Sequence, residues 1–102
     1  MIVAFDVDGT LIDFEDKPRY DIIDLLRWFY LNLHELGTED KLIIWSGGGI
    51  EYTKHWVKKL GLENYISDIL EKCSIDVDIA VDDAMDTENW GNEHKCKVVI
   101  KV

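Results

Sequence analysis

Short apolar runs and stretches of helical periodicity alternate along the amino-acid sequence. Residues 2–5 (IVAF) form an apolar run that leads into acidic residues and Gly9, which predicts a buried strand whose carboxyl end opens to solvent. The charged residues 13–17 predict a loop. The pattern then predicts a helix from Pro18, a residue that the first helical turn accepts, to about Glu35. Its apolar face comprises Ile22, Leu25, Leu26, Phe29 and Leu33.

The second half of the chain continues this alternation. Residues 41–45 predict a second buried strand, and the glycines at 47–49 break it before a helix that carries Trp56, Val57 and Leu60. A shorter amphipathic stretch and two further apolar runs that predict strands follow, at residues 62–70, 75–81 and 98–102.

Strands that alternate with helices are typical of a parallel sheet covered on both faces. We therefore expect an α/β fold with three layers, α/β/α and Rossmann-like, around a mostly parallel sheet. A chain of 102 residues, of which 47% are apolar, can close one hydrophobic core but is too short for two domains of ordinary size. Residues 1–102 are thus expected to form a single domain.

The chain carries a strong negative charge. Eleven basic residues against 21 acidic residues give a formal net charge of −10, which disfavours attraction to nucleic acid or to an anionic membrane. No apolar run approaches the roughly 20 residues that cross a bilayer, and we see no cleavable signal pattern, so we expect a cytoplasmic protein with no membrane partner. A phosphorylated substrate would need a local positive group, for which a metal ion is the obvious candidate.

Polar groups follow three of the expected strands. These are Asp6 and Asp8, then Ser46, then Asp82 and Asp83. Ligands of an open parallel sheet bind beyond the carboxyl ends of its strands, so these groups are expected in one site. Residues two apart on an extended chain point to the same side, and two carboxylates at ~4 Å repel by about 4 kcal/mol at an intermediate dielectric. Oxygen ligands without His or Cys indicate magnesium as the compensating cation.

Residues 5–11 (FDVDGTL) resemble the first motif of the haloacid dehalogenase (HAD) superfamily. Residues 43–47 (IIWSG) resemble its second motif, and residues 78–83 (DIAVDD) resemble its fourth, in the same order along the chain. This resemblance implies a HAD-like phosphatase of the small type that has no cap domain. It also implies a magnesium-dependent phosphohydrolase that cleaves a phosphomonoester.

The resemblance assigns the chemistry to the first motif. It implies that Asp6 attacks phosphorus and becomes an aspartyl phosphate, which divides one difficult displacement into two easier steps. Asp8 would protonate the leaving oxygen and then activate the hydrolytic water. Magnesium would bridge Asp6, the Asp8 carbonyl and a fourth-motif carboxylate, with Asp83 favoured over Asp82 and Asp86 as the direct ligand.

The remaining motif positions are expected to bind the substrate. The resemblance implies that Thr10, Ser46, Gly47 and Gly48 contact the phosphoryl group, the glycines through backbone N–H groups. Ser46 could instead cap the following helix. Lys72 stands where the family has its third-motif lysine, with Lys58 and Lys59 as alternatives.

Two alternative functions remain, and the sequence does not identify the substrate. One is a HAD-like domain that binds magnesium and a partner without turnover. The other is a receiver-like signalling domain, although Ser46 comes early for that fold and Asp-Gly-Thr follows the first strand. A site without a cap domain is open to solvent. In this superfamily such a site is associated with macromolecular phosphate substrates or with homo-oligomers in which a neighbouring subunit shields it. Small phosphomonoesters, nucleotides and phosphorylated proteins all remain candidate substrates.

Overall fold

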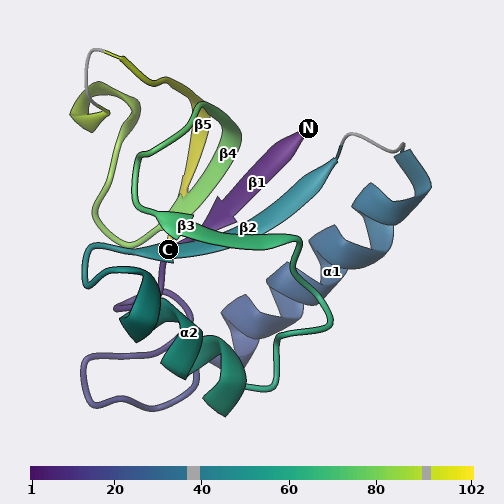
Figure 1. The fold of residues 1–102 in the computed structure, drawn as a ribbon, viewed down its shortest axis with the longest axis vertical. Helices are drawn as coiled ribbons and strands as arrows, with labels where there is room; N and C mark the ends of the chain where they lie inside the picture. The colour runs from purple at the N-terminus through teal and green to yellow at the C-terminus, as the bar shows by residue number, and fades with distance from the viewer. Residues whose placement is uncertain (37–39, 91–92) are drawn as a thin grey trace.

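A five-stranded sheet is the frame of the protein in this computed structural model, which describes residues 1–36, 40–90 and 93–102 (Figure 1). All its strand pairs are parallel, so the prediction of an α/β protein with a parallel sheet is confirmed. The strands are β1 (Ile2–Phe5), β2 (Lys41–Ser46), β3 (Asp68–Glu71), β4 (Val77–Asp82) and β5 (Cys96–Lys101). The helices are α1 (Tyr20–Leu36), α2 (Ile50–Lys59) and the short 3₁₀ helix η1 (Thr87–Asn89).

The strands lie in the order β3-β2-β1-β4-β5, with β1 at the centre. The chain therefore moves outward from β1 through β2 to β3, and then returns to the other side of β1 for β4 and β5. Phe5 pairs with Ile44 of β2 and with Val81 of β4, so the ends of three strands are level with one another. The order of the strands reverses between β1 and β4, and polar side chains follow both of these strands.

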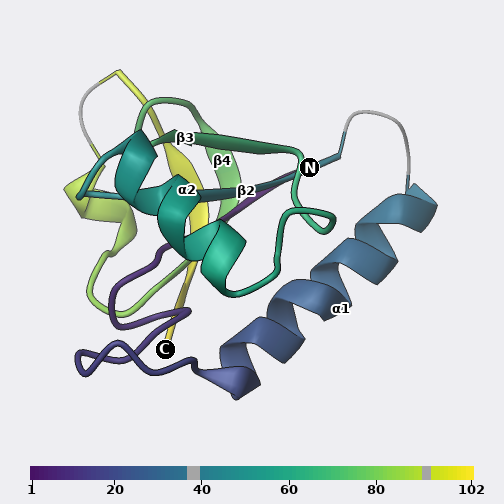
Figure 2. The same cartoon turned by 60° about the horizontal axis from the view of Figure 1, so that its bottom comes forward.

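The two faces of the sheet are covered differently. The core on one face joins Phe5 and Ile44 of the sheet to Leu26 and Phe29 of α1 and Val57 of α2, so both helices lie on this face (Figure 1). Figure 2 shows the same arrangement after a rotation.

On the opposite face, a smaller core gathers Ala4, Ile43 and Trp45 around Trp90. The rings of Trp45 and Trp90 are 5.1 Å apart, and the segment that brings Trp90 there contains η1. Among the described residues, this face is therefore covered by the segment that contains η1 and Trp90, and not by an α-helix.

The predicted amphipathic stretch 62–70 is divided between a turn and a strand. Leu62 is fully buried after the left-handed Gly61, and β3 then adds to the edge of the sheet beside β2, with Ile69 opposite Ile44. The short length of β3 and its half-buried side chains left it no clear alternating signature in the sequence. No helix in the described ranges has the length and apolar character required to cross a bilayer.

Candidate functional site

The candidate site lies where the strand order reverses. Asp6 follows β1 directly, and its backbone N–H donates a hydrogen bond to the carbonyl of Val81 in β4 at 3.0 Å. Asp82 is the last residue of β4. The pairing of the two strands therefore sets Asp6 beside Asp82 at the carboxyl edge of the sheet, the position at which open parallel sheets bind ligands.

Three carboxylates and one lysine meet at this edge. Asp6, Asp82 and Asp83 each place an oxygen within 4.8 Å of the others. The Lys72 ammonium lies 2.8 Å from Asp82 Oδ2 and 3.4 Å from Asp6 Oδ1. Burial lowers the pKa of Lys72, but the two carboxylates raise it by more. A single ammonium thus compensates only part of the negative charge.

Burial, neighbouring charges and hydrogen bonds change the pKa values of the three acids in different directions. Burial raises the pKa of Asp6 to about 7, the charge of Asp82 adds to the rise, and Lys72 opposes it. Burial also disfavours the charged form of Asp82, but the Ala84 N–H, Lys72 and the Met85 N–H outweigh it and hold the pKa below its usual value. Burial and hydrogen bonding with Asp82 raise the pKa of Asp83. The cluster has the oxygen donors and the uncompensated charge that suit a hard divalent cation.

A tight turn carries the chain from Asp6 past these acids. Gly9 is in the left-handed region at φ 75°, and a Cβ there would lie 2.3 Å from Asp83 Oδ2. Only glycine satisfies both the conformation and the close approach. Arg19 donates to the Gly9 carbonyl at 2.9 Å, which fixes the turn from the other side. Thr10 is fully buried in this turn, and its Oγ1 has no hydrogen-bond partner in the described part of the chain.

Asp8 is held by a residue that the sequence analysis missed. The hydroxyl of Tyr52, in the first turns of α2, donates a 2.6 Å hydrogen bond to Asp8 Oδ1, and this bond is the main cause of a raised Tyr52 pKa. Asp8 Oδ1 is thereby engaged outside the group formed by Asp6, Asp82 and Asp83. A signal did exist, because α2 begins directly after the glycines that follow β2 and so starts at the same edge of the sheet.

Ser46 ends β2, next to β1, and is almost fully buried. Its Oγ accepts the Gly48 N–H at 3.0 Å, while Gly49 is the N-cap residue of α2, so Ser46 does not cap the helix. A Cβ at Gly48 would lie 2.8 Å from the Tyr52 ring, whereas one at Gly47 would meet nothing within 4 Å. The turn is therefore tight beneath Tyr52 and open at Gly47.

The structure also shows which of the alternative lysines and acids lie at the site. Lys72, immediately after β3, is the lysine that contacts the carboxylates, whereas Lys59 lies over the Trp56 ring at 4.8 Å and Lys58 is in the last turn of α2. Asp86 is exposed and outside the three-carboxylate group. The expected residues Asp6, Asp82, Asp83 and Lys72 thus come together, with Asp8 and Ser46 at the ends of the same central strands.

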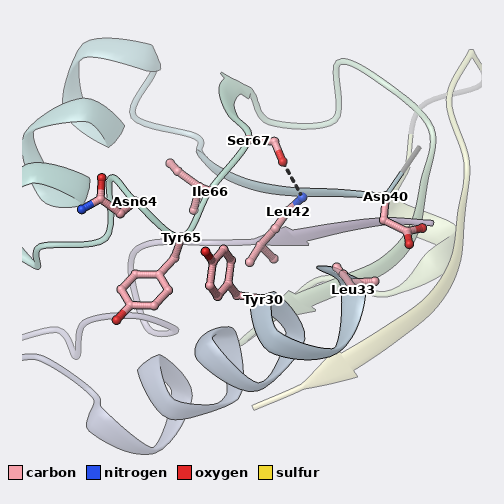
Figure 3. A pocket seen from close by; sticks show the side chains of 8 residues that line it. All are labelled: Tyr30, Leu33, Asp40, Leu42, Asn64, Tyr65, Ile66 and Ser67. Carbon is pink, nitrogen blue, oxygen red and sulfur yellow. Dashed lines mark hydrogen bonds between the residues drawn. The ribbon is translucent and has the colours of Figure 1, made fainter. Parts of the chain in front are cut away.

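A separate pocket lies at the other end of the sheet (Figure 3). Tyr30, Tyr65 and Asp40 line it, together with Leu42 near the start of β2, whose N–H donates to Ser67 Oγ at 3.2 Å. None of the carboxylates that follow β1 and β4 contributes to this pocket. This pocket is therefore distinct from the candidate site.

Comparison of the chain with protein-family models, with curated proteins and with solved structures gave no match. The motifs and the geometry of the site are therefore the basis on which a function can be assigned.

The raised pKa of Asp6 predicts a pH-dependent gain of stability on its replacement. Between about pH 4 and pH 7 the folded protein keeps the Asp6 proton that the unfolded chain has lost, so the free energy of unfolding falls as pH rises through this window. In EDTA, Asp6→Asn should therefore stabilise the protein by up to about 4 kcal/mol near pH 8 and change it little near pH 4.

Thermal denaturation across this pH range measures the effect. The matched control is Asp24→Asn, which alters an exposed aspartate on α1 and should shift the midpoint similarly at every pH. An Asp6→Asn protein that is no more stable than the native protein near pH 8 would show that ionised Asp6 does not destabilise the fold.

Proposed function

We propose that the protein is a magnesium-dependent phosphohydrolase of the HAD type, in which Asp6 carries the phosphoryl group during cleavage of a phosphomonoester. The observation that carries the proposal is the meeting of Asp6 with Asp82, Asp83 and Lys72 at the reversal of strand order. The resemblance gives these groups their roles, through residues 5–11 for Asp6, residues 78–83 for Asp82 and Asp83, and the position of the third-motif lysine for Lys72. The geometry supports the proposal because it brings together acids that are more than 70 residues apart in sequence.

The topology supports the same assignment. The order β3-β2-β1-β4-β5 corresponds to the first five strands of the Rossmann arrangement and differs from the 2-1-3-4-5 order of receiver-type domains. We infer a three-layer fold whose third layer is reduced to the segment with η1. Gly47–Gly49 alone join β2 to α2, and residues 6–19 join β1 to α1, so neither connection holds a cap domain.

Asp6, Asp82 and Asp83 would hold the magnesium ion, with the carbonyl of Asp8 as the further ligand that the resemblance implies. The donor set fits, because Mg²⁺ binds oxygen ligands and one lysine leaves the cluster negatively charged. When bound, the ion supplies positive charge that offsets the repulsion between carboxylates and an incoming phosphate. Asp82 is fixed for this role by the N–H groups of Ala84 and Met85 at 3.0 and 3.1 Å.

In the first step, a carboxylate oxygen of Asp6 attacks phosphorus, and the bond between phosphorus and the ester oxygen breaks. Asp8 gives its proton to the departing oxygen, so the leaving group departs as a neutral alcohol. Lys72 contacts Asp6 at 3.4 Å and favours its ionised, nucleophilic form against the effect of burial. The product of this step is a phosphoryl group on Asp6.

In the second step, water attacks the phosphorus of this acyl phosphate. Asp8, now a carboxylate, takes a proton from the water while the bond between phosphorus and Asp6 breaks. Inorganic phosphate leaves and the Asp6 carboxylate is restored. Tyr52 holds Asp8 in both steps, and the open turn at Gly47 gives the phosphoryl oxygens access to the start of α2.

Phosphate release from phenyl phosphate and a panel of small phosphomonoesters tests the function. We expect release with magnesium, none with EDTA, and a loss of at least about 10³-fold in Asp6→Asn, because the nucleophile is removed. The exposed Asp24→Asn is the control and should retain the native rate. Release that persists in Asp6→Asn would refute the role of Asp6, and a folded, magnesium-binding protein without any release would favour partner binding without turnover.

The hydrogen bond from Tyr52 to Asp8 predicts a second kinetic effect. Tyr52→Phe keeps the ring but removes the donor, and a hydrogen bond to a charged group is worth about 1.5–3 kcal/mol. We expect kcat to fall by roughly ten-fold or more with little change in KM, because Asp8 acts in the chemical steps. Tyr20→Phe, which removes an exposed hydroxyl, should leave both constants unchanged. An equal loss in both variants would contradict a role for Tyr52 in positioning Asp8.

A further inference from the structure

Phe14 is exposed beside the candidate site. Its side chain is 82% exposed, the largest value among the large apolar side chains of the described residues. Burial of a phenylalanine side chain stabilises a fold by roughly 1.5–3 kcal/mol, and the exposed Phe14 ring contributes only a small part of this stabilisation. The ring is therefore accessible to another molecule.

The loop that carries Phe14 is closed by hydrogen bonds. Asp13 Oδ1 accepts the N–H groups of Glu15 and Lys17 at 2.8 and 2.9 Å, and the Asp13 N–H donates to the Lys17 carbonyl at 2.8 Å. Asp16 completes the turn in the left-handed conformation, at φ 62°. The backbone on both sides of Phe14 is thus fixed, and the ring is presented to solvent from an ordered turn.

The ring lies next to the carboxylates. The position that a Cβ would occupy on Gly9 is 2.9 Å from Phe14 Cζ and 2.3 Å from Asp83 Oδ2, so the ring edge and this carboxylate adjoin across Gly9. The Phe14 ring therefore borders the acidic site.

We propose that Phe14 contacts the leaving group of the substrate and gives the protein a preference for phosphomonoesters whose leaving group carries a planar aromatic ring. This inference rests on the proposed phosphohydrolase function. An exposed ring on a fixed backbone offers a flat apolar surface, and aromatic groups pair with such a surface at little entropic cost. Three acidic residues, Asp13, Glu15 and Asp16, lie next to Phe14 in the sequence, so a leaving group with further negative charge is disfavoured.

The test compares kcat/KM for three substrates: phenyl phosphate, a nucleoside 5′-monophosphate and glycerol 2-phosphate. This ratio covers the steps up to departure of the leaving group, so it reports the contact even when hydrolysis of the aspartyl phosphate limits kcat. Phe14→Ala should lower kcat/KM about ten-fold for a ring-bearing substrate and less than about two-fold for glycerol 2-phosphate. Phe14→Leu, which keeps an apolar side chain but not the flat ring, should lie between.

The matched control is Leu31→Ala, which removes another exposed apolar side chain, on α1. It should leave kcat/KM unchanged for all three substrates. A fall in kcat/KM for phenyl phosphate, for the nucleotide or for both, but not for glycerol 2-phosphate, supports the inference. The substrate that is affected shows whether Phe14 contacts a phenyl group or a nucleobase. An equal loss for all three substrates, or no loss, overturns it while the proposed function stands. Absence of hydrolysis of every substrate by the native protein overturns the proposed function itself.

Discussion

The negative charge gathered at the carboxyl ends of β1 and β4 is the constraint on which the rest of the site depends. The buried pairing of Phe5 with Val81 fixes the register of these strands, and the residues that follow must then lie side by side. Two carboxylates about 4 Å apart repel by about 4 kcal/mol at an intermediate dielectric, and a third acid joins them here. Burial raises the pKa of Asp6 to about 7, the charge of Asp82 adds to the rise, and Lys72 relieves only part of it.

Several local features keep this arrangement in place. Gly9 lets the chain turn within reach of Asp83, where any side chain would collide with the carboxylate. Gly48 leaves room for the ring of Tyr52, whose hydroxyl donates a hydrogen bond to Asp8. The cores on the two faces of the sheet stabilise the strands that hold these turns, so packing offsets the charge repulsion. The resulting cluster of oxygen donors with uncompensated negative charge suits a hard divalent cation.

The elements that the sequence predicted well are those with strong local patterns. The contiguous apolar runs of β1, β2 and β4 and the helical face of α1 did not depend on distant residues, and the acids at the strand ends followed from them. The strand β3 was missed because its four residues gain their stability from pairing with β2. Coverage of the second face through Trp90 likewise depends on a contact with Trp45 far away in sequence.

The candidate site shows the same division. The acids and Lys72 were predicted by position relative to the motifs, whereas Tyr52 and Phe14 were not, because their significance comes from contacts across turns. The sequence analysis favoured Asp83 over Asp82 as the direct metal ligand, but the contacts of the two residues could not be predicted from the sequence. The structure distinguishes them, since Asp82 pairs with Lys72 and Asp83 faces Gly9.

The most direct test of the account is chemical identification of the group on Asp6. The native protein would be quenched in acid during turnover of phenyl phosphate with magnesium, reduced with borohydride, and analysed by peptide mass spectrometry. The account predicts conversion of Asp6 to homoserine only in samples that contained substrate. Release of phosphate with Asp6 unmodified, or with the phosphoryl group found on another residue, would contradict it.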